Sequence, residues 1–141
     1  TEMDVRWWSK LPAAQVRVAL QHLLRGGEFL EVDGEFLRAQ LADDVAATPR
    51  SAFRRPILLP GFDEFILGYQ DRLFAMTDDV HTHLAPGNMG VFRKAVVVDG
   101  VVRGTWKGAG GRLELEDIGG IPKYAAPGIR RAFSQYPFHN G

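Results

Sequence analysis

Two histidines and two aspartates lie close together in the sequence, where they could hold a metal ion. His81 and His83 follow directly after Asp78 and Asp79. Zinc sites need three or four converging ligands. Residues two apart point to different faces of a helix, and the spacing places no further ligand nearby. We therefore expect solvated loop histidines here, with no metal and no cofactor.

Acidic residues and an arginine form a second group that could do chemistry. Asp63 and Glu64 are adjacent, and Asp71 and Arg72 follow them. Adjacent helical residues point about 100° apart, so Asp63 and Glu64 cannot form a matched acid–base dyad on their own. The chain also lacks the motifs of serine hydrolases, phosphate-binding loops and zinc proteases. We expect no catalytic residue, although a small-molecule enzyme with a site around Asp63, Arg72 and His81 stays an alternative.

Basic and amide side chains suited to DNA form the largest group. Arginine and glutamine can read base edges, and arginine and lysine can contact phosphates. Arg17, Gln21 and Arg25 recur every four residues, which places them on one side of a helix. An ordinary solvated face explains this stripe equally well. The other candidates for DNA contact are Arg54, Arg55, Arg93, Lys94, Arg103 and Lys107.

The composition limits how DNA could be bound. The chain has 141 residues with 17 basic and 17 acidic side chains, so its formal net charge is zero. Contact with duplex DNA must therefore come from local basic patches. The absence of cysteine excludes disulfides and cysteine-bound metals. No apolar run is long enough to span a membrane and no signal peptide is visible, so we expect a cytoplasmic protein.

Two adjacent tryptophans, Trp7 and Trp8, stand near the start of the chain. Side chains of this size usually pack into a core. We therefore expect an upstream element that covers them. A different hypothesis is that the chain is an interaction or dimerisation module in which Trp7 and Trp8 cover a partner; the sequence does not fix the oligomeric state.

The first part of the chain predicts a partial winged helix-turn-helix over residues 1–42. A short helical turn at residues 4–8 is followed by a longer helix, with Ser9 as its N-cap and Pro12 at an early position. Gly26 and Gly27 end this helix. The pair Asp33-Gly34 predicts a hairpin turn, because both residues tolerate positive φ. Residues 43–55 are expected to be mostly a connector, broken by proline.

Residues 56–141 predict a β-rich C-terminal lobe with packed helices. The apolar stripe after Pro60-Gly61 predicts a helix over residues 62–74, and residues 77–88 read as a loop with room for one turn of helix. A second hairpin should turn at Asp99-Gly100, followed by a strand at residues 112–118 and a closing helix near residues 127–135. The expected fold class is α+β: a partial winged helix followed by a small antiparallel β-meander or barrel-like sheet.

Four blocks in this order are similar to a known family. They are DVRWWSKLPAA (4–14), LLPGFDEFILGYQDR (58–72), PGNMGVF (86–92) and VVDGVVRGTWK (97–107). The chain resembles the winged-helix DNA-binding family that includes the bacterial DNA glycosylases acting on alkylated bases and interstrand crosslinks. The resemblance implies tandem winged helices followed by a β-rich lobe, of which this chain matches only the C-terminal part.

The resemblance also bears on function and on single residues. It implies a DNA-binding module from a DNA-repair protein, with the earlier winged helices missing. The glycosylases of the family carry a glutamine-apolar-glutamine motif that does not occur here, so no catalytic residue carries over. Asp63 and Arg72 are expected to be polar anchors at the junction of the two parts. The full structural signature is Asp63, Arg72, Asn88, Gly100 and Trp106.

Overall fold

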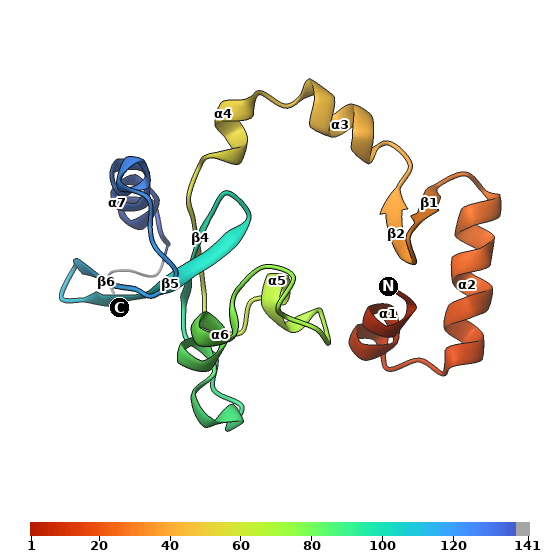
Figure 1. Ribbon diagram of the computed structural model, residues 1–141, viewed down its shortest axis with the longest axis horizontal. Coiled ribbons are helices and arrows are strands. Elements are labelled where there is room, and N and C mark those ends of the chain that lie inside the picture. The colour runs from red at the N-terminus through yellow and green to blue at the C-terminus, as the bar shows by residue number, and fades with distance from the viewer. Residues whose placement is uncertain (138–141) are drawn as a thin grey trace. The chain divides into compact units, whose positions relative to one another are not determined.

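The computed structural model describes residues 1–137, and within that range the side chain of Asn88 is outside the description. The chain forms two compact units (Figure 1). Unit 1 contains residues 1–49 and 67–71, and unit 2 contains residues 50–66 and the chain from residue 72 onward. The described residues form a mixed fold with seven α-helices and two antiparallel sheets. Among them, no helix combines the length and apolar character needed to cross a membrane.

Unit 1 consists of helices and a two-stranded hairpin. Its elements in chain order are α1 (Glu2–Ser9), α2 (Ala13–Arg25), β1 (Phe29–Val32), β2 (Glu35–Arg38) and α3 (Leu41–Ala47). The hairpin pairs Phe29 with Arg38 at its open end. Asp33 and Gly34 have φ of 52° and 82° at the turn. The hairpin predicted there is confirmed.

The boundary between α1 and α2 differs from the prediction. α1 is a full helix, capped by Thr1, whose hydroxyl accepts a hydrogen bond from the Asp4 amide at 3.3 Å. The prediction that Ser9 caps the second helix is wrong, because Ser9 is the last residue of α1. Lys10 then turns the chain at φ 58°, and Pro12 stands at the N-cap of α2 with extended backbone. Pro12 fits there because it lacks an amide hydrogen to donate.

The predicted helix over residues 62–74 is wrong in extent, since only α5 (Glu64–Leu67) is helical. It cannot start at Phe62, which has φ 63°. It ends at Leu67 because that carbonyl accepts a bond from the Trp7 indole at 3.0 Å, and the Gln70 amide donates to the Asp4 carboxylate at 3.1 Å. These backbone groups bond to α1 instead of continuing the helix, which makes residues 67–71 part of unit 1.

Unit 2 is built around a four-stranded antiparallel sheet. Besides α5, its elements are α4 (Arg50–Phe53), β3 (Ile57–Leu59), α6 (Asp78–Leu84), the 3-10 helix η1 (Pro86–Asn88), β4 (Ala95–Val98), β5 (Val101–Ala109), β6 (Arg112–Asp117), the 3-10 helix η2 (Lys123–Ala125) and α7 (Ala126–Ser134). The strands pair in chain order, β3 to β6. This is an antiparallel meander with β3 and β6 at its edges, and β3 is a strand that the sequence analysis did not predict.

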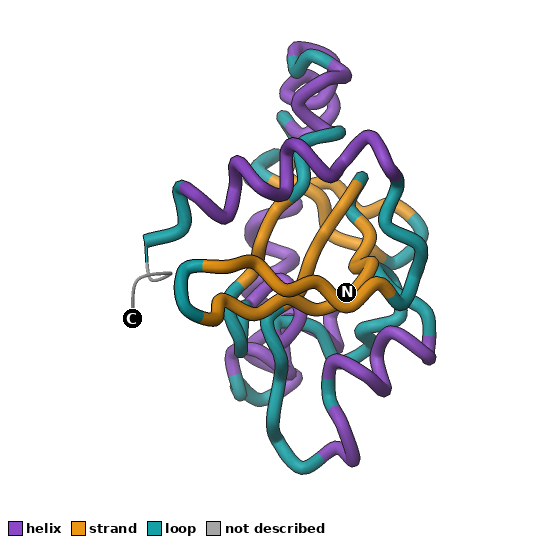
Figure 2. Tube along the Cα trace, turned by 90° about the vertical axis from the view of Figure 1, so that its left-hand side faces the viewer, coloured by secondary structure: helices purple, strands orange, loops and turns teal. Residues whose placement is uncertain are grey.

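Both faces of this sheet are covered by hydrophobic cores. On one face, Val97 and Val102 pack with Val80 and Leu84 of α6. On the other face, the strands pack against α7 in a cluster centred on Trp106. Figure 2 shows the long β5–β6 hairpin beneath α7. Because helices cover both faces, every residue of β4 is buried.

Two segments expected to lack regular structure are helical. Residues 43–55 contain most of α3 and all of α4, although the described helices bury no residue there. Residues 77–88 contain α6, which Thr77 caps by accepting from the Val80 amide at 3.4 Å. Val80 and Leu84 are buried one turn apart, so tertiary packing holds this helix together. The prediction of a loop with one helical turn at residues 77–88 is therefore wrong in extent, because α6 alone covers seven of these residues.

Candidate nucleic-acid interface

The outer side of α2 carries the side chains predicted for DNA contact in unit 1. Val16 and Leu20 are 1% and 7% exposed, so they fix the side of α2 that faces inward. Arg17, Gln21 and Arg25 are all exposed. The stripe predicted from their spacing therefore lies in solvent.

Arg17 has an intramolecular partner. Its Nε donates to both carboxylate oxygens of Glu2, at 3.1 and 3.0 Å. This pair joins α1 to α2 and compensates the arginine charge. Arg17 is thereby placed as a strut between the two helices, although its side chain stays 62% exposed.

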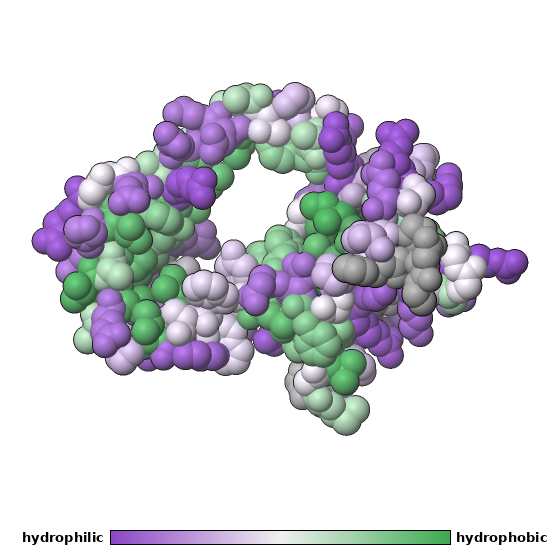
Figure 3. All heavy atoms as spheres, turned by 180° about the vertical axis from the view of Figure 1, so that it is seen from behind, coloured by the Kyte–Doolittle hydropathy of each residue, from purple (hydrophilic) through white to green (hydrophobic). Residues whose placement is uncertain are grey.

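Gln21 and Arg25 end the stripe, next to a residue that the sequence analysis did not select. Arg25 Nε donates to the backbone carbonyl of Gln21 at 3.2 Å, and both residues are exposed. His22 lines an open hollow of about 550 Å³ beside Arg25. The lining consists of Ala14, Gln15, Val18, Ala19, His22 and Arg25. Figure 3 shows the surface of this unit, with hydrophobic side chains open to solvent between hydrophilic ones.

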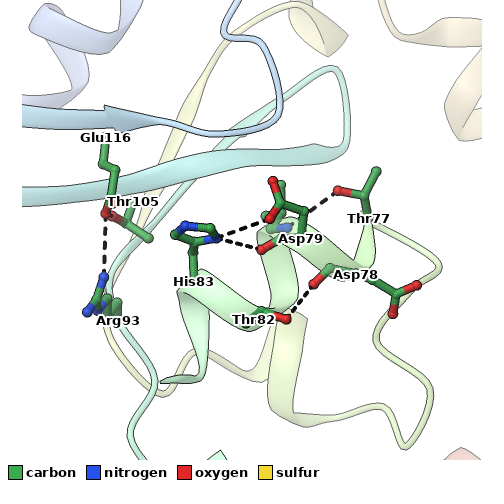
Figure 4. A network of polar contacts seen from close by, with 9 residues as sticks. Thr77, Asp78, Asp79, Thr82, His83, Arg93, Thr105 and Glu116 are labelled. Atoms are coloured by element: carbon green, nitrogen blue, oxygen red, sulfur yellow. Dashed lines mark hydrogen bonds and ion pairs between the residues drawn. The ribbon is translucent and has the colours of Figure 1, made fainter. Parts of the chain in front are cut away.

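In unit 2, Arg93 belongs to a polar network on the β5–β6 sheet face. Thr105 donates its hydroxyl hydrogen to Glu116 at 2.8 Å, and Arg93 Nη1 lies 3.5 Å from the same carboxylate oxygen (Figure 4). Lys107 pairs across the strands with Glu114. A hollow of about 300 Å³ at this place is lined by Arg93, Thr105, Trp106, Lys107, Glu114, Leu115 and Glu116. Two cations and two carboxylates share this hollow, so it presents no net positive charge.

Lys94 and Arg103 are also held by contacts within unit 2. Lys94 Nζ lies 4.6 Å from the centre of the Trp106 ring and 5.7 Å from that of Tyr136. Arg103 Nη1 donates to the Gly119 carbonyl at 3.1 Å, and its Nε is buried. The structure thus gives Arg93, Lys94 and Arg103 acidic, aromatic or carbonyl partners within unit 2 and places Lys107 opposite Glu114 across the strands.

Arg54 and Arg55 are different, because both are exposed at the end of α4. Neither side chain forms a hydrogen bond or an ion pair with another described residue. Arg54 is close enough to Tyr124 for its charge to act on the pKa of that phenol. These two arginines keep their charge available at the surface of unit 2.

The predicted structural anchors Asp63 and Arg72 are both half-buried. Asp63 Oδ1 accepts from the Phe65 amide at 2.9 Å at the start of α5. Its charge, second to burial, raises the pKa of the Tyr136 phenol. The Arg72 guanidinium lies 5.0 Å from the centre of the Phe92 ring, and its Nε is buried. Asp63 and Arg72 thus each contact a neighbouring group, the Phe65 amide and the Phe92 ring, and their role as anchors stays a prediction.

The other members of the signature lie in or beside the sheet. Gly100, at φ 75°, forms the β4–β5 turn together with Asp99, as the sequence predicts. Trp106 is 2% exposed, and its indole donates to the Leu59 carbonyl at 2.9 Å. Asn88 falls in η1, and its side chain lies outside the described residues.

The structure also describes the residues of the two alternative functions, a small-molecule enzyme and an interaction module. His81 and His83 lie on α6, and His83 Nδ1 contacts the Asp79 carbonyl at 2.8 Å. Across residues 1–137, no three acidic or histidine side chains gather in a way that could hold a metal ion. Trp8 is 66% exposed, while Trp7 is bonded to Leu67 and covered by the Lys10 ammonium at 3.8 Å from its ring centre. Neither alternative is tested by these contacts.

Comparison with known proteins places the chain in one family. The family described as "DNA glycosylase AlkZ-like" matches residues 1–136. The solved structure of the Streptomyces sahachiroi DNA glycosylase AlkZ is similar, with a TM-score of 0.69 and 22% identity over 95% of this chain. The chain spans 39% of the length of that structure. No match was found among curated proteins.

The family match confirms the glycosylase relationship that the sequence resemblance predicted, and the similar structure confirms the mixed α/β architecture with two antiparallel sheets. The chain belongs to the AlkZ-like DNA glycosylase family.

Proposed function

We propose that this chain is a DNA-binding part of a DNA-repair protein and that unit 1 docks on duplex DNA as a winged helix-turn-helix. The observation that carries the proposal is the outer side of α2, which presents Gln21 and Arg25 to solvent while its inner side is buried. α1, α2 and the β1–β2 hairpin follow in the order of a helix-turn-helix with a wing. Membership of a DNA glycosylase family supports DNA as the partner.

The chemistry of this side of α2 suits base edges. Glutamine pairs with adenine through two hydrogen bonds, and arginine pairs with guanine in the same way. Arg17 would act indirectly, because its bond to Glu2 fixes α1 against α2. Arg38, exposed on β2, would contact phosphate.

We assign binding, and not base excision, to this chain. The resemblance implies a glutamine-apolar-glutamine motif for excision, and no such triplet occurs in the 141 residues. Because the chain spans 39% of the similar glycosylase, we propose that it corresponds to one part of a longer protein of this kind, and the resemblance implies the C-terminal part.

The test is a titration of fluorescent duplex DNA with the chain at two salt concentrations. Binding should weaken steeply with salt, because counterions are released from the phosphates. The double variant Gln21→Ala/Arg25→Ala should bind at least about tenfold more weakly, since each bidentate pair contributes roughly 1–3 kcal/mol. Arg6→Ala, an exposed arginine on α1, is the matched control and should bind normally. Binding that is absent at low salt, or unchanged in the double variant, would overturn the proposal.

A further inference from the structure

Acidic residues are absent from two long stretches of this otherwise charge-balanced chain. Residues 45–62 contain three arginines and no Asp or Glu, and residues 118–137 contain one lysine, two arginines and no Asp or Glu. The cations are Arg50, Arg54, Arg55, Lys123, Arg130 and Arg131. Since the whole chain has equal numbers of acids and bases, these stretches concentrate positive charge.

The fold of unit 2 brings the two stretches together. β3 packs against α7, and Leu58 and Ile129 share one core cluster. Pro56 lies directly against Gly128, so closely that a Cβ on this glycine would be 2.8 Å from the proline ring. Arg54 and Arg55, just before Pro56, therefore lie beside α7. In Figure 3, hydrophilic side chains gather over the end of α4 and over α7, at the upper right.

Helix geometry selects which cation of α7 faces the end of α4. At about 100° per residue, Arg131 is roughly 60° around the helix from Gly128, whereas Arg130 is roughly 160° away. Arg131 therefore lies on the Pro56 side of α7, and Arg130 lies on the other flank. Both arginines are exposed.

A tyrosine and its acidic partner contribute to the electrostatics around Arg54. Tyr124 precedes Gly128 by one turn, and its hydroxyl donates to Asp99. That bond, followed by burial and the charge of Asp99, raises the pKa of Tyr124, and the charges of Arg54 and Arg103 act against the rise. Asp99 is thus hydrogen-bonded to the phenol on which the Arg54 charge acts. Within residues 1–137, the side chains of Arg54, Arg55 and Arg131 form no bond to an acidic residue.

We propose that Arg54, Arg55 and Arg131 form a second DNA-contact surface, which we call the α4–α7 basic face, and that it binds the phosphodiester backbone of duplex DNA. This inference rests on the proposed function and adds a contact in unit 2 that is independent of α2. Guanidinium groups bind phosphate oxygens through charge-assisted hydrogen bonds, so we assign this contact to phosphates, where it carries no sequence preference. The arginines of the α4–α7 basic face also differ from the cations of the second hairpin, which have partners or acidic neighbours within unit 2.

The experiment measures duplex binding by fluorescence anisotropy between 50 and 200 mM salt, roughly the range over which phosphate contacts are resolved. Each phosphate contact contributes about 0.9 to the slope of log affinity against log salt. The triple variant Arg54→Ala/Arg55→Ala/Arg131→Ala should therefore reduce the slope by about 2 to 3 and weaken binding more than about tenfold at 0.1 M salt.

The matched control removes the same charge elsewhere. Arg6→Ala/Arg112→Ala/Arg130→Ala also takes three exposed arginines from the surface and keeps the α4–α7 basic face intact. Its slope should stay near that of the unaltered chain. The charge-retaining variant Arg54→Lys/Arg55→Lys/Arg131→Lys should keep most of the slope, which separates loss of charge from loss of folding.

The outcomes separate this inference from the proposed function. If Gln21→Ala/Arg25→Ala weakens binding while the two arginine triples behave alike, only the α4–α7 basic face is wrong. If the unaltered chain does not bind duplex DNA, both proposals fail. Inorganic phosphate at matched ionic strength should compete no better than chloride; specific competition would indicate a free-phosphate site and would also overturn the inference.

Discussion

Different interactions stabilise each of the two units of this protein. In unit 1, the described core is small, with Val16 and Leu20 as its buried apolar residues. Long-range bonds from Trp7 and Asp4 to residues 67 and 70 add to this core. In unit 2, helices cover both faces of a sheet and bury two clusters. Unit 1 therefore depends on a small core and a few long-range polar links, and unit 2 depends on extensive packing.

The same contrast appears in their surfaces. A small core leaves unit 1 with exposed apolar and polar side chains along α2, such as Val18 at 64% exposure. In unit 2, cations near the sheet are paired, and free arginines remain at the edge formed by α4 and α7. A unit with a large core can carry charge on its outer elements without cost to its packing, because those positions are already solvated.

The largest effect should come from Trp106→Ala. The indole is buried, donates to Leu59 and packs edge-on against Phe133 and Tyr136 at 5.9 and 4.7 Å. Removal of a buried aromatic costs about 3–5 kcal/mol. We expect the free energy of unfolding of unit 2 to fall by this amount in urea denaturation. Trp106→Phe is the control and should cost less. Equal losses in both variants would show that the ring does not organise this core.

Leu20→Ala should have a smaller effect that is confined to unit 1. Leu20 is one of two buried residues there, and deletion of a buried leucine side chain costs about 2–5 kcal/mol, with the low end expected in a small core that can collapse. Hydrogen exchange of the backbone amides measures this loss of stability separately in each unit. The amides of α2 and β1 should lose protection, while β4 and β5 keep theirs. Loss of protection across both units would contradict the division of stability between them.

The sequence predicts the hairpins and the longest helix well, because their signals are local. Asp33-Gly34 and Asp99-Gly100 can adopt positive φ, and α2 has a clear apolar stripe. The sequence fails where distant contacts decide the structure. The apolar stripe after Phe62 continues as a pattern, but α1 binds the backbone at residues 67 and 70 and ends the helix there.

The sequence suggests which types of residue could contact DNA, but it places only some of them correctly in the fold. Spacing correctly placed Gln21 and Arg25 on an exposed side of α2. It could not show that Arg93 lies beside Glu116, because the two are 23 residues apart and meet only through strand pairing. Arg131 was missed for the same reason. The absence of acids from residues 118–137 was the available signal, and the fold is needed to join it to Arg54.

Trp7→Phe tests the polar link that attaches residues 67–71 to unit 1. Phenylalanine keeps an aromatic ring but loses the indole bond to the Leu67 carbonyl. A typical hydrogen bond contributes about 0.5–1.5 kcal/mol, and we expect a loss in that range from thermal unfolding of unit 1. Trp8→Phe is the matched control, because Trp8 is 66% exposed, and it should be neutral. If both variants lose the same stability, the link to Leu67 contributes nothing specific.

The smallest effect should be a pH dependence of the stability of unit 1 that comes from the Asp4 carboxylate. Burial alone would raise the pKa of Asp4, but bonds from Thr1, the N-terminal ammonium and the Gln70 amide together lower it below the ordinary value of 3.8. A carboxyl whose pKa is lowered by folding adds stability above its unfolded pKa and loses it as the pH falls through the folded value. Solvent screening limits this gain to at most about 1 kcal/mol.

Asp4→Asn separates this contribution from general acid unfolding. At pH 7 the variant should be slightly less stable than the unaltered chain, and the two stability curves should converge below about pH 4, where Asp4 becomes protonated. Trp7→Phe removes the neighbouring link without a titrating group, so its deficit should not change across the same pH range. A deficit of Asp4→Asn that stays constant from pH 7 to pH 3 would mean that the Gln70 amide is held by geometry and not by the charge of the carboxylate.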